Sequence, residues 1–396
     1  MKILALIPSF YGPTGEAVNE RQLITALSKK AEKVYVVTFI GLRQIFTKRR
    51  NEIKIPRFPN LKVILIPIPQ IHPLIIYTAM LVISCILTIL LIVLHLISKM
   101  KVDIIYIRNS FLSMGFLTFN FLSKRTVVKI HSIIEEEVQA NKIIKLVIKK
   151  FVTILDRLAL NKARRIAVHN LLFYKKLVKL RLAKHHDVPL EIPPGVDLHL
   201  MEKVKKVAKR KKDQNLINIG FVGTLTWWQG ADILVQAVAL LRTKYPAVKL
   251  YFIGDGELRT KIERECKALN IPCEITGFLP HEEALRYLGL LDIVVIPRKR
   301  TITTESTIPL KLIESWAIGV PVVMTAHEAL KQKYKDGEDV LYVEPVPEDV
   351  ARKIMVLLSS KDIREKLSKK GIINAKEFNY EIIVSKIIKS LNNYDE

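Results

Sequence analysis

Two glycine turns and one glutamate in the second half of the chain have the types and spacing of a phosphate-binding site. One apolar run ends at Gly223, and another runs into Gly254. A third apolar run is followed by a helix that is predicted to begin near Pro309. The N–H groups and dipole of such a helix start attract phosphate. Glu314 lies about one helical turn further on, where its carboxylate can accept hydrogen bonds from ribose hydroxyls.

Basic residues surround this predicted helix start. Three of them follow the apolar run 292–297 directly, and a fourth lies inside the predicted helix: Arg298, Lys299, Arg300 and Lys311. Positive charge at these positions suits a phosphorylated ligand. The ordered set of turns, helix start and basic residues is stronger evidence for such a site than any single glycine turn.

The elements that position these residues are short apolar runs that alternate with helical patterns throughout the chain. Strands that are apolar on both faces and alternate with helices indicate parallel sheets covered on both sides. Two such series predict an α/β fold class with two doubly wound domains, divided by the lysine-rich run 202–212. In open sheets of this kind, ligands bind outside the carboxyl ends of the strands. The predicted strands are 2–8, 33–39, 61–69, 102–109, 126–132, 164–170, 217–223, 248–256, 273–277, 292–297, 321–325 and 340–345.

The net charge of the chain predicts an anionic partner. The 396 residues include 63 Lys and Arg against 38 Asp and Glu, which gives a net charge of +25. Nucleic acid, an anionic membrane surface and a phosphorylated ligand all fit this balance. Nucleic acid is disfavoured because the basic stretches lack interleaved aromatic residues.

Three cysteines without a CxxC pair favour a reducing, cytoplasmic setting.

Two segments of the first half point to a membrane surface. No charged residue lies between Lys62 and Lys99, and 74–97 would form a helix of roughly 36 Å, which is enough to cross a bilayer. A simple crossing would separate strands of one sheet, so the segment is either a monotopic element on the inner face of the cell membrane or a buried or partner-covered helix. The segment 142–184 is basic and amphipathic, with Asp156 as its one acidic residue. Together the two segments favour contact with anionic lipids.

Several stretches resemble family 4 of the retaining glycosyltransferases. They are SFYGPTGEAVNERQL at 9–23, IPPGVDLHL at 192–200 and PLKLIESWAIGVPVV at 309–323. The resemblance implies the GT-B fold, in which two Rossmann-like domains face each other. It also implies an N-terminal acceptor-side, membrane-associating domain at 1–198, completed by a crossover helix at 377–396, and a nucleotide-sugar domain at 213–376.

The resemblance also implies site residues. Glu314 would hold the nucleotide ribose, and His131 would contact the transferred sugar, so that these two are the expected catalytic residues. The loop after the first strand would lie near the donor phosphate and the acceptor. The expected donor-binding residues are Gly12, Gly15, Gly223, Gly254, Arg298, Glu305, Thr307, Ile308, Leu310 and Lys311.

The chain departs from the family pattern at three places. Ser306 occupies the position of the first of two paired glutamates, and Glu305 is displaced by one residue. Thr224 and Gln229 occupy the positions of an arginine and a lysine that usually serve the diphosphate. The serine that usually follows the last N-domain strand is replaced by His169.

The implied activity is transfer of a hexose, with retention, from a nucleotide diphosphate sugar to a lipid or lipid-linked glycan acceptor at the cytosolic membrane face. Such an enzyme takes the nucleotide sugar as its donor substrate and needs neither a metal nor another cofactor; no Asp-x-Asp pair suits one. Two alternatives remain open. One is a non-catalytic, membrane-docked subunit of similar fold, and the other is a nucleotide-sugar epimerase.

Overall fold

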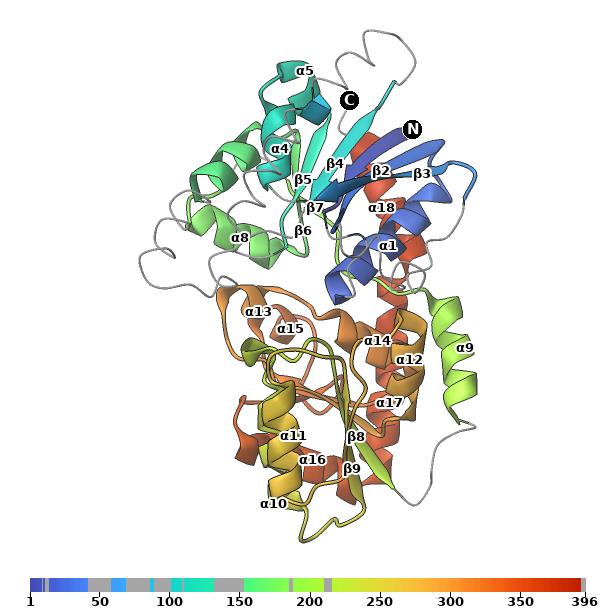
Figure 1. The fold of residues 1–396 in the computed structure, drawn as a ribbon, viewed down its shortest axis with the longest axis vertical. Helices are drawn as coiled ribbons and strands as arrows, with labels where there is room; N and C mark the ends of the chain where they lie inside the picture. The colour runs from blue at the N-terminus through green and yellow to red at the C-terminus, as the bar shows by residue number, and fades with distance from the viewer. Residues whose placement is uncertain are drawn as a thin grey trace. The chain divides into compact units, whose positions relative to one another are not determined.

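The computed structural model describes residues 1–8, 10, 14–41, 58–68, 86–88, 101–108, 110–131, 153–184, 188–209 and 216–392. These residues divide into two compact units (Figure 1). The first unit draws on the ranges 1–12, 20–193 and 384–396, and the second on 13–19 and 194–383. Gly12, the segment 142–152 and all of 74–97 except 86–88 lie outside the described residues.

The first unit contains a parallel sheet whose strand order is β3-β2-β1-β4-β5-β6-β7. Its described strands are β1 (Lys2–Leu6), β2 (Lys33–Gly41), β3 (Leu61–Ile68), β4 (Ile104–Arg108), β5 (Thr126–Lys129), β6 (Arg165–Val168) and β7 (Leu190–Glu191). The two-residue strand β7 is the one strand that hydrophobic patterning did not predict. The helices named in this unit are α4 (Ser110–Leu117), α5 (Asn120–Ser123) and α8 (Leu171–Lys179).

The second unit contains a parallel sheet of order β10-β9-β8-β11-β12-β13. Its strands are β8 (Ile217–Val222), β9 (Val248–Ile253), β10 (Cys273–Ile275), β11 (Ile293–Ile296), β12 (Val322–Thr325) and β13 (Leu341–Val343). Its helices are α9 (Leu198–Lys209), η2 (Trp227–Gln229), α10 (Ala231–Leu241), α11 (Arg259–Ala268), α12 (His281–Leu290), α13 (Ile302–Ser306), α14 (Leu310–Ile318), α15 (Glu328–Lys331), α16 (Pro347–Ser359), α17 (Lys361–Ala375) and η3 (Lys376–Phe378).

Two helices contribute residues to both units. Residues 15–19 of α1 (Gly15–Ser28) belong to the second unit and the rest to the first. Likewise, α18 (Tyr380–Asn392) begins in the second unit and ends in the first. Within the second unit, the Tyr380 hydroxyl donates to Asn19 Oδ1 at 2.6 Å, and the Gly195 amide donates to the same oxygen at 3.2 Å.

Helices cover both faces of the second sheet. Alternate residues of β11 belong to two different hydrophobic clusters: Ile293 and Val295 pack with α10 and α16, whereas Val294 and Ile296 pack with α12 and α14. This two-sided burial is why the strands read as unbroken apolar runs in the sequence. Among the described residues, no helix combines the length and the apolar character that crossing a bilayer requires.

Each sheet has one position where successive strands are added in opposite directions. In the first sheet it lies between β1 and β4, and in the second between β8 and β11. A crevice opens beyond the carboxyl ends of the strands at such a switch point, and ligands of open α/β sheets bind there. The residues that follow β8 and β11 are therefore the first place to look for a site.

Candidate functional site

The loops after β8 and β9 contact each other backbone to backbone. Gly223 has a φ of 138° and Gly254 a φ of 145°, which are conformations that residues with a Cβ rarely adopt. A Cβ at Gly254 would overlap the carbonyl oxygen of Gly223, and one at Gly223 would overlap the Lys311 ammonium. Both predicted glycines thus permit close approach at the carboxyl edge of the sheet.

Lys311 lies at the amino end of α14, with its Nζ against Gly223. Burial lowers the pKa of Lys311 to about 7, and the nearby Arg298 guanidinium lowers it further than Glu314 raises it. No carboxylate forms a salt bridge with Lys311 among the residues that the structure describes. This lysine is therefore held in an environment that penalises its charge when no anion is present.

Arg298 is the second cation of this site. It follows β11, only 8% of its surface is exposed, and its Nε donates a hydrogen bond to Gln229 Oε1 at 3.0 Å. Its guanidinium carbon lies 5.5 Å from the centroid of the Trp228 ring. Burial lowers the pKa of Arg298 to about 10, so it stays protonated at neutral pH. Gln229 thus positions a cation in place of the basic residue that the family resemblance implied there.

Arg298 and Lys311 together form a cationic site without a counter-ion. Neither makes a salt bridge to an acidic residue in the described part of the chain. Two like charges close together each raise the free-energy cost of keeping the other one charged. The site lies at the carboxyl ends of β8 and β11, which is the switch point of the sheet. A ligand with two or more negative charges, such as a diphosphate, would remove the electrostatic penalty.

Glu314 lies on α14, the same helix as Lys311, and its carboxylate contacts a residue that the sequence analysis did not single out. It is 5% exposed, and its Oε1 lies 2.6 Å from Nε2 of His281, the first residue of α12. The separation of 33 positions along the chain hides this pairing from any local motif. No signal in the sequence pointed to His281.

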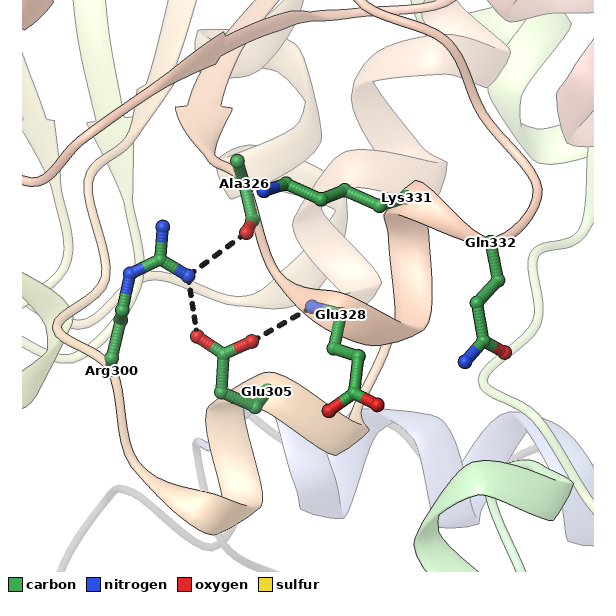
Figure 2. Close-up of a pocket in the computed structure, with 6 residues that line it drawn as sticks. All are labelled: Arg300, Glu305, Ala326, Glu328, Lys331 and Gln332. Atoms are coloured by element: carbon green, nitrogen blue, oxygen red, sulfur yellow. Dashed lines mark hydrogen bonds and ion pairs between the residues drawn. The ribbon is translucent and has the colours of Figure 1, made fainter.

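Glu305 belongs to a separate ionic network beside a pocket of about 500 Å³ (Figure 2). Arg300 Nη1 lies 2.6 Å from Glu305 Oε1, and Arg300 Nη2 lies 2.7 Å from Glu344 Oε1. The backbone N–H of Glu328 donates to Glu305 Oε2 at 2.8 Å. Burial alone would raise the pKa of Glu305, but these donors hold it below its usual value. Arg300 is therefore neutralised within the protein, unlike Arg298.

The remaining predicted donor residues have mixed surroundings. The Thr307 hydroxyl donates to the Thr303 carbonyl at 3.0 Å, while Ile308 and Leu310 pack against the apolar cluster under α14. Gly15 begins α1, and a Cβ there would meet nothing within 4 Å. Gly12 lies outside the described residues. Thr307, Ile308 and Leu310 thus shape the helix start rather than present side-chain charge.

A cluster of ionisable and polar groups lies at the carboxyl edge of the first sheet. Glu20 and Lys129 are fully buried, and Lys129 Nζ donates to Glu20 Oε1 at 2.8 Å. His131 Nε2 lies 3.0 Å from the same oxygen, and His131 Nδ1 lies 2.7 Å from His169 Nε2. The Tyr106 hydroxyl donates to Glu20 Oε2 at 3.0 Å. The predicted His131 is therefore the centre of a buried network.

The surroundings of both histidines in this cluster favour the neutral ring. Burial holds their pKa values well below the usual 6.5, and the positive charges of Arg108 and Lys129 lower the pKa of both further. Sequence patterning missed Glu20 because it lies inside an amphipathic helix, where an acidic residue is expected to face solvent.

Comparison with protein families gives a match to the second unit. Residues 202–373 match the family model described as glycosyl transferases group 1. The matched range contains Arg298, Lys311, Glu314 and His281, and therefore the whole cationic site.

Curated relatives match parts of the chain. The lipopolysaccharide core biosynthesis glycosyltransferase LpsE of Rhizobium meliloti is 28% identical over 144 residues, which are 36% of this chain and 40% of that protein. The GDP-mannose-dependent alpha-(1-6)-phosphatidylinositol dimannoside mannosyltransferase of Mycobacterium tuberculosis is 29% identical over 145 residues, 36% of each chain. The chain thus spans less than half the length of these relatives.

Solved structures match the whole fold. Sucrose-phosphate synthase from Thermosynechococcus elongatus has a TM-score of 0.76 at 16% identity, covering 99% of this chain and 98% of that one. HepE from Anabaena, in complex with UDP and glucose, has a TM-score of 0.72 at 15% identity, covering 99% and 100%. These matches confirm the predicted α/β fold with two Rossmann-like, parallel-sheet domains of the GT-B type.

Proposed function

We propose that the protein is a glycosyltransferase whose group 1 domain binds a nucleotide diphosphate sugar. The observation that carries this proposal is a pair of cations, Arg298 and Lys311, at the carboxyl ends of β8 and β11, neither of which forms a salt bridge with a described acidic residue. A glycosyltransferase must stabilise the negative charge that develops on the departing diphosphate. A non-catalytic subunit would have no use for two cations at this position that lack a salt bridge to any described acidic residue.

Each residue of the site then has a defined task. Lys311 and Arg298 bind the diphosphate, and Gly223 lets a phosphate oxygen approach the backbone. His281 occupies Oε1 of Glu314, which leaves Oε2 to accept hydrogen bonds from the ribose hydroxyls. The hexose would be transferred with retention, as the resemblance to family 4 implies, and no side chain is assigned as a covalent nucleophile.

Donor binding is the direct test of this function. Thermal shift with UDP-, GDP- and ADP-sugars should identify one donor that raises the Tm, since a ligand that binds only the folded state stabilises it by mass action. If no nucleotide sugar binds in calorimetry, the proposal is wrong.

Glu314→Gln tests the ribose contact. Loss of the charged acceptor should lower kcat/KM for that donor about 10- to 100-fold, mainly through KM, because a hydrogen bond to a charged group is worth about 1.5–3 kcal/mol. The matched control is Glu263→Gln on the exposed face of α11. Equal kinetics for Glu314→Gln and wild type would contradict the assigned role.

We further propose that the acceptor is a lipid or lipid-linked glycan, reached at the cytosolic face of a membrane. Large apolar side chains are exposed on the first unit next to lysines, including Phe119 (41%), Phe121 (42%) and Leu171 (47%). Nine basic residues and one acidic residue occupy the described part of the predicted basic segment, 153–184. Exposed apolar groups interspersed with basic ones suit an anionic lipid surface. LpsE and the mannosyltransferase are named for lipid-linked products, which supports the same class of acceptor.

Charge reversal at Lys162 and at two lysines of α8 tests this membrane proposal. The triple variant Lys162→Glu, Lys175→Glu, Lys179→Glu should bind anionic phosphatidylglycerol vesicles at least about tenfold more weakly, since each basic residue near such a surface contributes about 1 kcal/mol. Flotation measures the effect. The control reverses three exposed lysines of α17, Lys361, Lys366 and Lys369, and should bind as wild type does. Equal loss in both variants, or no binding by wild type, would contradict docking through this surface.

A further inference from the structure

The buried cluster of the first unit has a defined hydrogen-bond direction. Lys129 and Tyr106 both donate to the Glu20 carboxylate, which therefore acts as an acceptor. His131 Nε2, 3.0 Å from Glu20 Oε1, must then carry a hydrogen and donate it. A neutral imidazole has one donor and one acceptor, so His131 Nδ1 is an acceptor.

The second histidine, His169, completes the series of hydrogen bonds that begins at Glu20. His169 Nε2 lies 2.7 Å from His131 Nδ1, so it must be the donor of that bond. In the neutral ring this leaves His169 Nδ1 as a bare lone pair. That nitrogen is buried and has no hydrogen-bond partner among the described residues. An unsatisfied buried acceptor is uncommon and calls for a donor supplied from outside the protein.

We propose that His169 Nδ1 accepts a hydrogen bond from a hydroxyl group of the sugar substrate, which makes His169 a specificity-determining residue. His131 cannot take this role while Glu20 and His169 occupy both of its ring nitrogens. His169 follows β6 and His131 follows β5, at the carboxyl edge where open sheets bind ligands. The inference rests on the proposed glycosyltransferase function.

This series of hydrogen bonds explains why a histidine replaces a serine at position 169. A serine hydroxyl can rotate and both donate and accept, whereas this histidine has its donor fixed towards His131 and offers only an acceptor. Glu20, Lys129 and His131 set that direction through three buried hydrogen bonds, two of them made by His131. A hydroxyl is the matching donor, and either the donor hexose or the acceptor glycan can provide it.

Deoxy-sugar analogues of the donor found in the thermal shift screen test the contact. His169→Phe keeps a planar ring and removes both nitrogens. Wild type should lose about 10- to 100-fold in kcat/KM when the contacted hydroxyl is removed, because the lone pair is then left unpaired. His169→Phe should show less than a threefold difference between the same two substrates. Deoxy analogues of the acceptor are compared in the same way, so that discrimination among donor analogues reports a hydroxyl of the hexose and discrimination among acceptor analogues reports a hydroxyl of the acceptor.

Two further variants keep the outcome clear. His169→Gln can donate to His131 and still accept, so it should retain the discrimination that His169→Phe loses, even if both are less stable. His199→Phe, on the exposed side of α9, should behave as wild type. If wild type and His169→Phe discriminate equally against every deoxy analogue of the bound donor and of the acceptor, the inference is wrong while the proposed function stands.

Nitrogen-15 NMR of histidine-labelled protein tests the chain without any substrate. Both His131 and His169 should be Nε2–H tautomers, and the Nδ1 signal of His169 should shift when the donor sugar or acceptor is added. An Nδ1–H tautomer at His169 would overturn the inference. Absence of any nucleotide-sugar binding would instead overturn the proposed function, so the two failures are distinguishable.

Discussion

Lys311→Met is expected to lower kcat/KM for the nucleotide sugar about 100- to 1,000-fold while raising the Tm of the free protein. In the proposed function the variant removes a cation that would bind the departing diphosphate, and loss of one such preorganised group typically costs this much. It also removes a buried charge whose pKa is depressed to about 7, so the free fold becomes more stable. Steady-state kinetics and thermal denaturation measure the two effects. Lys267→Met, an exposed site on α11, is the control for both.

The same lysine predicts the pH dependence of donor binding and of stability. A bound diphosphate favours the ammonium form, so binding is strongest below pH 7 and weakens as the pH rises through the pKa of free Lys311. Because its pKa is depressed in the folded state, Lys311 destabilises the folded protein most below pH 7. This destabilisation becomes progressively smaller as the pH rises towards 10.5, the usual pKa of lysine. The Tm gain of Lys311→Met should therefore be larger at pH 6.5 than at pH 9. A UDP-sugar is a suitable probe because its diphosphate diester does not titrate here. Affinity that is flat between pH 6 and 9 would contradict the assignment.

Glu20→Leu is expected to destabilise the first unit by about 3–5 kcal/mol. The substitution leaves the fully buried Lys129 without the carboxylate that lies 2.8 Å from it, and breaking a buried ion pair costs this much because one charge stays uncompensated. Burial already lowers the pKa of Lys129, even with Glu20 present to raise it. Urea denaturation followed by circular dichroism measures the loss.

The matched double variant separates charge from packing. Glu20→Leu with Lys129→Met removes both charges and should recover most of the stability lost by Glu20→Leu alone, because apolar residues of similar volume replace a buried pair at little net cost. A double variant as unstable as the sum of its singles would show that Glu20 acts through its packing. The hydrogen bond from Tyr106 to Glu20 Oε2 is lost in both variants, so it does not affect this comparison.

Much of the fold was predictable because two-sided burial leaves a local signature. Runs such as 293–296 are apolar at every position, and each long run is followed by a helical pattern. The helix predicted from Pro309 to Gly319 is found as α14, capped by Gly319 with a φ of 86°. The strand β7 has only two residues, which are too few to form a hydrophobic pattern from which a strand can be predicted.

The site was less predictable because pairing between distant residues decides which charges are available. Four basic residues near the predicted phosphate site looked equivalent in sequence. In the structure, Glu305 and Glu344 neutralise Arg300, whereas no acid pairs with Arg298 in the described residues. The carboxylate of Glu314 is held by His281, and nothing local to either residue predicts that contact.

The close approach of the loops after β8 and β9 means that positions in the second unit differ in how well they tolerate substitution. At Gly254, any side chain would collide with a carbonyl oxygen of the neighbouring loop, which cannot move aside as a flexible side chain would. Tolerated substitutions must therefore arise at positions whose neighbours can adjust, such as the exposed Lys331 and Gln332 beside the pocket in Figure 2. A library that randomises those two positions should yield folded variants far more often than one that randomises Gly254.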